Sequence, residues 1–304
     1  MPEALTRLFA GVLPAACLHA DAPLKEYTTM RVGGPADLLA EPENEAQLVA
    51  ALRLARQKDI PVCLIGNGSN LLFSDAGFRG LALHVGKAMG EISCHDHCIH
   101  AGAGALLSVL ARSAAEHAWT GLEFAAGIPG SVGGAVCMNA GAYGGEISQV
   151  LTSAQVYMDG EVRTLSNQEL DFGYRHSAVM AHSGVVLSAD FALHEGDEAQ
   201  IAAVMADLAR RRREKQPLQY PSCGSFFKRP EGHYAGALIE QAGLKGYAIG
   251  GAQVSELHAG FLINRGGATA ADVYALMRHV QKMVLDRFGV MLEPEVKLIG
   301  QFEV

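Results

Sequence analysis

The chain has 304 residues, of which 49% are hydrophobic and 18% charged, so it is long enough to bury a sizeable core over about two domains. Its net charge of -8 argues against a nucleic acid or an anionic membrane surface as partner. A phosphorylated ligand would therefore be held by backbone N–H groups and a few local basic side chains.

The start of the chain does not resemble a targeting segment, because Glu3 and Arg7 interrupt its apolar residues. No run of 18 apolar residues occurs, so we expect no membrane span and a cytoplasmic location. Six cysteines are scattered along the chain, which without a secretion signal favours free thiols.

Residues 45–58 carry apolar side chains at helical spacing and are predicted to form an amphipathic helix. Residues 62–65 form an apolar run typical of a buried strand, which ends in the glycine-rich loop Gly66–Asn70. This loop has two interpretations. It presents a nest of backbone N–H groups, or it is a tight hairpin turn, since Asn-Gly is a strong hairpin signal.

The segment Cys94–His100 is dense in metal-ligand residue types. Its Cys-x3-Cys spacing has no second pair downstream, and a closed zinc site usually takes two pairs. We therefore favour a polar hairpin tip, with Ile92 and Ile99 facing inward, and predict no metal site.

Residues 106–117 are predicted to form a further helix, and the most distinctive segment of the chain follows. Gly127–Gly134 and Asn139–Gly145 are both rich in glycine, which costs about 1 kcal/mol per position in a helix relative to alanine. We expect irregular backbone here, whose N–H groups approach a phosphate-bearing cofactor.

Two strands, at 154–158 and 161–165, are predicted to form a hairpin around Asp159-Gly160, and residues 185–193 form another strand. Residues 197–213 are predicted to form a helix whose apolar face is Ile201, Val204, Met205 and Leu208.

The basic run Arg210–Lys215 ends this helix. It is either a solvated end that suits the helix dipole or a patch that faces phosphate. Residues 217–230 are irregular and mark a domain change. A last helix begins at Thr269, with Asp272 as capping partner, and ends at Gly289; residues 293–300 form a short strand.

Three early motifs, at Thr28–Asp37, Gly66–Asn70 and Gly127–Gly134, resemble the flavin-binding part of the UDP-N-acetylenolpyruvoylglucosamine reductase family. Later segments agree in the same order: Tyr174–Ser177, Ser222–Lys228, Ala252–Ser255 and Glu293–Val296. The connection between Ser177 and Val185 is short, as in the compact subgroup of the family, which lacks an extra substrate loop.

The resemblance implies an α+β (α/β) chain, with a two-lobed FAD-binding region of the vanillyl-alcohol-oxidase (PCMH) type and a smaller α+β substrate-binding domain. We predict that the FAD-binding region covers 1–212, with lobes at about 1–70 and 71–212. The substrate-binding domain then covers 213–304, and its last strand, at about 290–304, returns toward the FAD-binding region.

The resemblance also implies an FAD-dependent oxidoreductase of peptidoglycan precursor synthesis, and so of cell wall biogenesis, cell shape and cell division. The reaction would reduce UDP-N-acetylglucosamine enolpyruvate to UDP-N-acetylmuramate, with non-covalent FAD and with NADPH as the reductant. The partners implied are this small-molecule substrate, with no nucleic acid or membrane, and a monomer or a weak homo-oligomer.

Three catalytic residues follow from the resemblance: Ser225 protonates the carbanion or enol, while Arg175 and Glu295 stabilise it. An arginine suits this task because it holds a carboxylate through two parallel hydrogen bonds. Glu295 suits it if a hydrogen-bonded partner or a raised pKa keeps its charge low. Read without the family, Arg175 is a surface ion-pair partner, Glu295 ends a strand and Ser225 caps a turn.

The resemblance further implies the residues that touch FAD: Arg31, Gly66, Asn67, Gly68, Ser69, Asn70, Leu71, Gly127, Ile128, Pro129, Gly130, Ser131, Gly133, Gly134, Asn139, Gly141, Ala142 and Tyr143. The implied substrate-binding residues are Tyr174, Arg175, Lys215, Ser225, Lys228 and Arg229. The family often has asparagine at the position of Arg229, and this departure leaves the contact at that position open.

Overall fold

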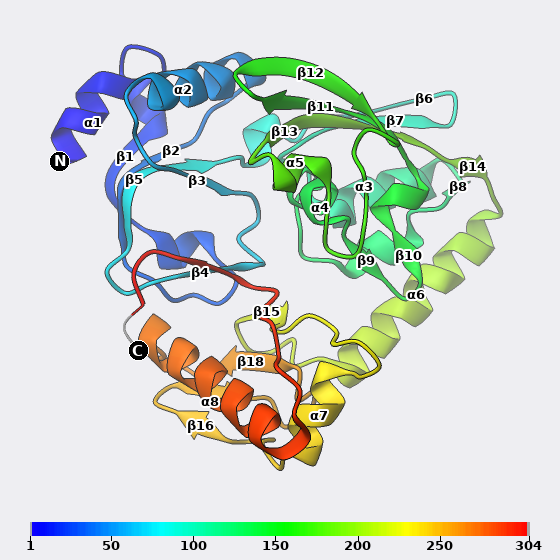
Figure 1. The fold of residues 1–304 in the computed structure, drawn as a ribbon. Coiled ribbons are helices and arrows are strands. Elements are labelled where there is room, and N and C mark those ends of the chain that lie inside the picture. Colours follow the sequence, from blue (N-terminus) through cyan, green and yellow to red (C-terminus); the bar gives the residue numbers. More distant parts are fainter. Residues whose placement is uncertain (1, 303–304) are drawn as a thin grey trace.

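The computed structural model describes residues 2–302, which form two lobes side by side and a third domain below them (Figure 1). Helices and strands are mixed throughout, as the sequence predicts. Within residues 2–302, no helix is long and apolar enough to cross a membrane. All six cysteines are free thiols.

The first lobe is built on a four-stranded sheet in the order β1-β2-β5-β3. β1 is antiparallel to β2, whereas β5 is parallel to both of its neighbours. The elements of this lobe are α1 (Pro2–Phe9), η1 (Ala15–Cys17), β1 (Leu18–Pro23), η2 (Leu24–Tyr27), β2 (Pro35–Ala40), α2 (Glu45–Gln57), β3 (Val62–Ile65) and β5 (Phe78–His84).

The first lobe extends further along the chain than the sequence suggests. The lobe boundary was predicted near residue 70, but β5 lies between β2 and β3 and completes the first sheet. Parallel strands pair through long connections, so a strand adjacent in space need not be adjacent in sequence. We therefore place the end of the first lobe after His84.

The second lobe contains a five-stranded antiparallel sheet in the order β12-β11-β13-β7-β6. The predicted hairpin around Asp159-Gly160 is confirmed, and so is the hairpin whose tip carries Asp96 and His97. The strands and helices of this lobe are η3 (Lys87–Met89), β6 (Ile92–His95), β7 (Cys98–Gly102), α3 (Leu107–Glu116), β8 (Trp119–Thr120), η4 (Glu123–Gly127), α4 (Val132–Met138), β9 (Gly141–Ala142), β10 (Gly145–Glu146), η5 (Ile147–Gln149), β11 (Leu151–Met158), β12 (Glu161–Ser166), α5 (Ala178–Ala181), β13 (Val185–Ala192) and β14 (His194–Glu195).

Part of the glycine-rich segment is helical, contrary to the expectation of irregular backbone. α4 begins after Ser131, whose side chain accepts a hydrogen bond from the N–H of Gly134. Gly133 lies in the first turn, where an added Cβ would stand 3.0 Å from the Cβ of Ala103. Gly133 therefore lets the helix pack closely on the chain after β7, and this packing outweighs the low helix propensity of glycine.

The helix α6 (Glu198–Lys215) leads from the second lobe to the third domain (Figure 1). Ile201 is its buried side chain, whereas Val204 is 41% exposed, so the predicted apolar face is narrower than expected. The reason is that α6 lies on the outside of the second lobe and contacts η4 and α3 through only a narrow face.

The third domain has an antiparallel sheet in the order β15-β18-β17-β16 and two helices. The capping box of Thr269 and Asp272 is confirmed, as is the helix end at Gly289, where φ is 69°. The elements are β15 (Ser222–Ser225), α7 (Ala235–Gln241), β16 (Ala248–Ile249), β17 (Ala252–Val254), β18 (Phe261–Asn264) and α8 (Ala270–Phe288).

The end of the chain joins the third domain to the first lobe. β19 (Lys297–Ile299) pairs in parallel with β4 (Leu71–Phe73), which directly follows the Gly66–Asn70 loop. The two parts also share a hydrophobic core, since Met30 and Leu72 are fully buried among residues of the third domain. This junction fixes the third domain against the glycine loop, and the candidate site lies beside it.

Candidate active site

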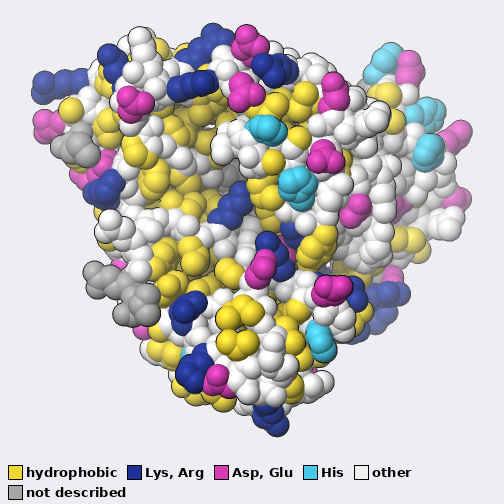
Figure 2. All heavy atoms as spheres, viewed as in Figure 1, with side chains coloured by type: hydrophobic (Ala, Val, Ile, Leu, Met, Phe, Trp, Pro, Cys, Tyr) yellow, Lys and Arg dark blue, Asp and Glu magenta, His cyan; other side chains and the backbone are white. Residues whose placement is uncertain are grey.

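Two neighbouring cavities lie where the lobes and the third domain meet. The larger has a volume of about 730 Å³ and the smaller about 410 Å³. β15 contributes Ser222 and Gly224 to the larger cavity and Ser225 to the smaller one. Figure 2 shows this face hollowed between the lobes, with Lys or Arg side chains near its centre. The cavities are thus two compartments on either side of one strand.

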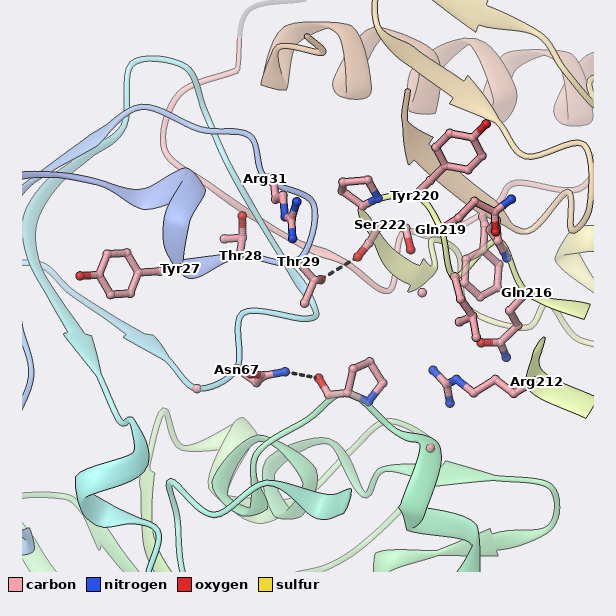
Figure 3. Close-up of a pocket in the computed structure, with 18 of the residues that line it drawn as sticks. Tyr27, Thr28, Thr29, Arg31, Asn67, Arg212, Gln216, Gln219, Tyr220 and Ser222 are labelled. Atoms are coloured by element: carbon pink, nitrogen blue, oxygen red, sulfur yellow. Dashed lines mark hydrogen bonds between the residues drawn. The ribbon is translucent and has the colours of Figure 1, made fainter. Parts of the chain in front are cut away.

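The larger cavity brings the two glycine motifs together. Five of the predicted cofactor residues line it: Arg31, Gly66, Asn67, Gly127 and Pro129. The side-chain amide of Asn67 donates a hydrogen bond of 2.9 Å to the carbonyl of Pro129 (Figure 3). This bond ties the loop of the first lobe to the loop of the second lobe.

The Gly66–Asn70 loop leaves its backbone donors open. The hairpin interpretation is wrong, because β3 and β4, on either side of the loop, belong to different sheets. Within residues 2–302, the N–H groups of residues 67–70 donate to no acceptor. At Gly68, φ is 62° and an added Cβ would lie 1.9 Å from the carbonyl oxygen of Tyr27. The loop is therefore held close to the first lobe with its N–H groups available to a ligand.

The Gly127–Gly134 loop differs, because most of its backbone donors are already used. The N–H groups of Val132 and Gly133 donate to the carbonyls of Ala105 and Ala103, at 2.8 and 2.9 Å. The N–H groups of Ile128, Gly130 and Gly134 also have acceptors inside the protein. Open N–H groups are therefore found in the first glycine loop, whereas these five N–H groups of the second loop already have acceptors.

Several predicted cofactor residues line neither cavity: Gly68, Ser69, Asn70, Leu71, Ile128, Gly130, Ser131, Gly133, Gly134, Asn139, Gly141, Ala142 and Tyr143. The side chain of Asn139 is occupied within the protein. Its oxygen accepts from the N–H of Ser148, and its amide donates to the carbonyl of Gly173. Asn139 therefore fixes the backbone just before Tyr174 and Arg175.

The smaller cavity brings all three predicted catalytic residues together: Arg175, Ser225 and Glu295. The Nε of Arg175 donates to Oε1 of Glu295 at 2.8 Å, and the two side chains are 23% and 14% exposed. The backbone N–H of Glu295 donates to the carbonyl of Phe226 at 2.9 Å. This bond holds the glutamate beside the end of β15, where Ser225 is exposed to the cavity.

Arg175 occupies a tight turn with a φ of 54°. A non-glycine residue in this region costs free energy and persists where the surrounding structure holds it. Asn139 supplies part of that support through its bond to Gly173, at the start of the turn. The strained turn positions the guanidinium over the cavity, as is common at functional sites.

Burial raises the pKa of Glu295 above its ordinary value, although Arg175 and then Lys228 act to lower it. Desolvation penalises the charged carboxylate, and here it outweighs the ion pair with Arg175. A carboxyl group of raised pKa holds a proton more readily near neutral pH. The environment of Glu295 is thus of the kind that its predicted role requires.

The remaining predicted substrate residues divide into two groups. Tyr174 and Arg229 line the smaller cavity, where the Tyr174 hydroxyl accepts from the backbone N–H of Arg229 at 3.1 Å. Lys215 is exposed at the end of α6, and Lys228 pairs with Glu293 at 3.2 Å. Neither lysine lines either cavity.

Three residues that line the cavities were not named individually as site residues, although Arg212 belongs to the basic run for which a phosphate-facing patch was one of two interpretations. Arg212 and Gln216 line the larger cavity, and His258 lines the smaller one. A signal for Arg212 was present, because it continues the spacing of Ile201 and Leu208 on the inner face of α6. His258 carried no such signal; its Nδ1 accepts from the N–H of Gly260 and burial lowers its pKa.

The larger cavity fits a phosphorylated cofactor such as FAD. The hydroxyl of Thr28 and Oε1 of Gln216 are buried and have no hydrogen-bond partner among residues 2–302, and both residues line the cavity. Buried polar groups normally have partners, so these two point to a polar ligand. Within residues 2–302, neither Arg31 nor Arg212 pairs with a carboxylate. Open N–H donors, free guanidinium groups and a volume typical of cofactor sites suit an anionic ligand.

Comparison with known proteins agrees with both parts of the site. Residues 36–166 match the family described as "FAD binding domain", and residues 216–299 match "UDP-N-acetylenolpyruvoylglucosamine reductase, C-terminal domain". A UDP-N-acetylenolpyruvoylglucosamine reductase from Agathobacter rectalis is 53% identical and covers 99% of this chain and 100% of its own length. One from Pediococcus pentosaceus is 52% identical and covers 96% and 97%.

Solved structures confirm the predicted fold. The UDP-N-acetylenolpyruvylglucosamine reductase of Thermus caldophilus has a TM-score of 0.78 at 36% identity and covers 93% of this chain and 98% of its own. An alkyldihydroxyacetonephosphate synthase, at 14% identity and a TM-score of 0.50, covers 64% of this chain and 41% of its own, and shares the fold alone. The FAD-binding region is thus of the two-lobed vanillyl-alcohol-oxidase type. The chain belongs to the family of UDP-N-acetylenolpyruvoylglucosamine reductases, which are FAD-dependent oxidoreductases.

Proposed function

We propose that the protein uses NADPH and bound FAD to reduce UDP-N-acetylglucosamine enolpyruvate to UDP-N-acetylmuramate, in the cytoplasm. The relatives' name gives the substrate class. The observation that carries the proposal is the meeting of Arg175, Ser225 and Glu295 in one cavity, beside the cavity that fits FAD. These three residues come from distant segments of the chain and have the chemistry that the reaction needs.

The reaction adds hydrogen across the double bond of an enolpyruvyl group. When bound, the flavin supplies the hydride, which no amino-acid side chain delivers. Negative charge then develops on the carbon next to the carboxylate. The protein therefore has two tasks in the smaller cavity: it stabilises this charge and it delivers one proton.

Arg175 stabilises the charge in this proposal. Its guanidinium is always protonated, and its Nε bond to Glu295 leaves the remaining N–H donors available for a carboxylate. The pair is only partly exposed, so the field of the guanidinium is screened less than at an open surface. Glu295 orients Arg175, and its raised pKa reduces repulsion of the anionic substrate.

Ser225 delivers the proton in this proposal. It is exposed to the cavity at the end of β15, and the antiparallel pairing of Ser225 with Phe261 fixes its position. The hydroxyl gives its proton to the carbon and takes one back from solvent. A positioned proton donor of this kind contributes about 10²–10⁴-fold to a rate.

The rest of the substrate extends beyond this centre. Tyr174 and Arg229 stand at the smaller cavity, where the guanidinium of Arg229 lies 4.1 Å from the ring centroid of Tyr234. We propose that Arg229 binds the diphosphate or the sugar of the substrate. Lys228 and Lys215 then contact the outer edge of the substrate. NADPH enters the same cavity before the substrate, which agrees with the lack of a separate nicotinamide motif in the sequence.

A spectroscopic titration tests the proposal. The purified protein should show flavin absorbance, NADPH should bleach it without oxygen, and the enolpyruvyl substrate should restore it. A sugar or lactone oxidase of the same fold would instead be restored rapidly by oxygen and not by this substrate. A protein without flavin absorbance, even after incubation with FAD, would contradict the proposal.

A further inference from the structure

The four consecutive arginines at the end of α6 have different environments. Arg210 and Arg211 each pair with Asp207 at 2.6 Å, and Arg210 also pairs with Glu214. Arg212 pairs with no carboxylate within the described residues, and its side chain enters the larger cavity (Figure 3). Its Nη1 lies 3.2 Å from the point where a Cβ on Gly127 would stand.

Arg212 carries a partly desolvated charge. Burial lowers the pKa of its guanidinium, with Tyr143 opposing the effect. A buried charge without a partner costs free energy, so a partner is expected when the cavity is filled. This distinguishes Arg212 from Arg213, its exposed neighbour, which lines neither cavity.

Gln216 provides a second polar group at the same place. Its backbone N–H donates to the carbonyl of Arg212 at 2.9 Å, so the two residues lie one helical turn apart at the end of α6. Its Oε1 is buried and accepts no hydrogen bond from any residue in 2–302. Together the two side chains offer N–H donors from a guanidinium and one acceptor that lacks its donor (Figure 3).

This pattern favours the flavin ring of the cofactor over its phosphates. A phosphate group satisfies Arg212 but has no N–H to give to Oε1 of Gln216 at neutral pH. The pyrimidine edge of a flavin ring has carbonyl oxygens that accept and, between them, an N–H that donates. Such an edge satisfies both side chains at once, whereas the open backbone N–H of Asn67, which lines the same cavity, suits a phosphate.

The position of the pair agrees with the chemistry. Arg212 and Gly224 both line the larger cavity, and Ser225 follows Gly224 on β15 in the smaller one. We propose that Arg212 and Gln216 bind the pyrimidine edge of the flavin ring, and that Arg212 stabilises the negative charge that the ring gains on reduction. This proposal concerns the resident FAD and rests on the proposed function only for the source of the electrons.

The charge balance gives the expected effect. A nicotinamide that transfers a hydride to the ring delivers two electrons and one hydrogen nucleus, so the ring gains one negative charge. A positive group at the pyrimidine end binds the reduced form more tightly than the oxidised form. The loss of Arg212 should therefore lower the affinity for reduced FAD, relative to oxidised FAD, by about tenfold, which is about 30 mV for a two-electron couple.

The test is the midpoint potential of FAD in the holoenzyme, measured by equilibration with a reference dye and without NADPH or substrate. Arg212→Ala should lower the potential by about 30 mV, whereas Arg213→Ala should leave it at the wild-type value. Arg212→Lys should restore most of the potential, because it keeps the charge. A wild-type potential in Arg212→Ala would overturn the proposal, even if this variant binds FAD more weakly, because weaker binding alone indicates a phosphate contact.

Two further results keep the test decisive. If Arg212→Ala does not retain FAD, the potential of Arg212→Lys and of Gln216→Leu is compared with the wild type. Gln216→Leu should weaken FAD binding but leave the midpoint potential close to the wild-type value, because Arg212 is still present. Unchanged FAD affinity in this variant would contradict the role of Gln216. The outcome is separate from the proposed function, because the substrate is absent from the measurement.

Discussion

The two cavities differ in how their charged groups are satisfied. In the smaller cavity, Arg175 and Glu295 pair with each other at 2.8 Å. In the larger cavity, Arg212 has no carboxylate partner within residues 2–302, and the Thr28 hydroxyl is buried without a hydrogen bond. The larger cavity therefore leaves polar groups that a bound ligand would satisfy, whereas the central ion pair of the smaller cavity forms without a ligand.

Gly68→Val should have the largest effect, and it acts on the larger cavity. The new side chain would meet the carbonyl of Tyr27, and φ at this position is 62°. Clash and backbone strain together should cost about 3 kcal/mol or more and abolish FAD retention. Flavin content after purification measures this. Gly232→Val is the matched control, because φ is 69° there but the space around its Cβ is open; equal loss in both variants would contradict the clash.

Arg175→Ala should have the second-largest effect, and it should affect the function of the smaller cavity alone. It removes the group that stabilises the developing charge, which should lower the rate of substrate reduction by about 10²–10³-fold. FAD content and the rate of flavin reduction by NADPH should stay close to wild type, as stopped-flow absorbance can measure. Loss of FAD from this variant would contradict the separate roles of the two cavities.

Glu295→Gln should change how stability depends on pH. The folded-state pKa of Glu295 is raised, so the stability from its protonated form is present below the ordinary glutamate pKa. That stability is lost as pH rises from about 4.3 through the raised value. The free energy of unfolding of wild type minus that of Glu295→Gln should therefore fall over this window. Urea unfolding at a series of pH values measures it, and a rising difference would contradict the raised pKa.

Arg229→Ala should have the smallest effect. Its guanidinium lies over the ring of Tyr234 at the edge of the smaller cavity, a contact worth about 0.5–1 kcal/mol when exposed. Because an exposed ion pair with the anionic substrate contributes no more than about 1 kcal/mol, we expect a rise in KM for the enolpyruvyl substrate of about twofold to fivefold, at unchanged kcat. Steady-state kinetics test this. A large fall in kcat would place Arg229 in the chemistry and not at the edge.

The sequence predicted most of the fold where local patterns decide it. The helix of α8 follows from its capping box at Thr269 and its end at Gly289, and the β11–β12 hairpin follows from Asp159-Gly160. The place of β5 in the first sheet was missed, because parallel pairing depends on contacts between distant segments. The helix α4 was missed because tertiary packing outweighs the low helix propensity of its glycines.

The candidate site was predictable from motifs to a similar degree. The family pattern named Arg175, Ser225 and Glu295, which the fold brings together. It did not name Arg212, since its role depends on which face of α6 meets the second lobe. Glycine content also failed to distinguish the two loops. Only the hydrogen bonds show that residues 67–70 keep open N–H groups and that Val132 and its neighbours do not.

The most direct test of the account is the pair of half-reactions of Ser225→Ala, followed without oxygen by stopped-flow absorbance. Hydride transfer from NADPH to the flavin needs no proton from the protein, so NADPH should reduce the bound flavin at close to the wild-type rate although Ser225 lines the smaller cavity. Reoxidation of that flavin by the enolpyruvyl substrate should slow by about 10²–10⁴-fold, because the proton donor is gone. Reoxidation at the wild-type rate would contradict the assignment of Ser225 as the proton donor.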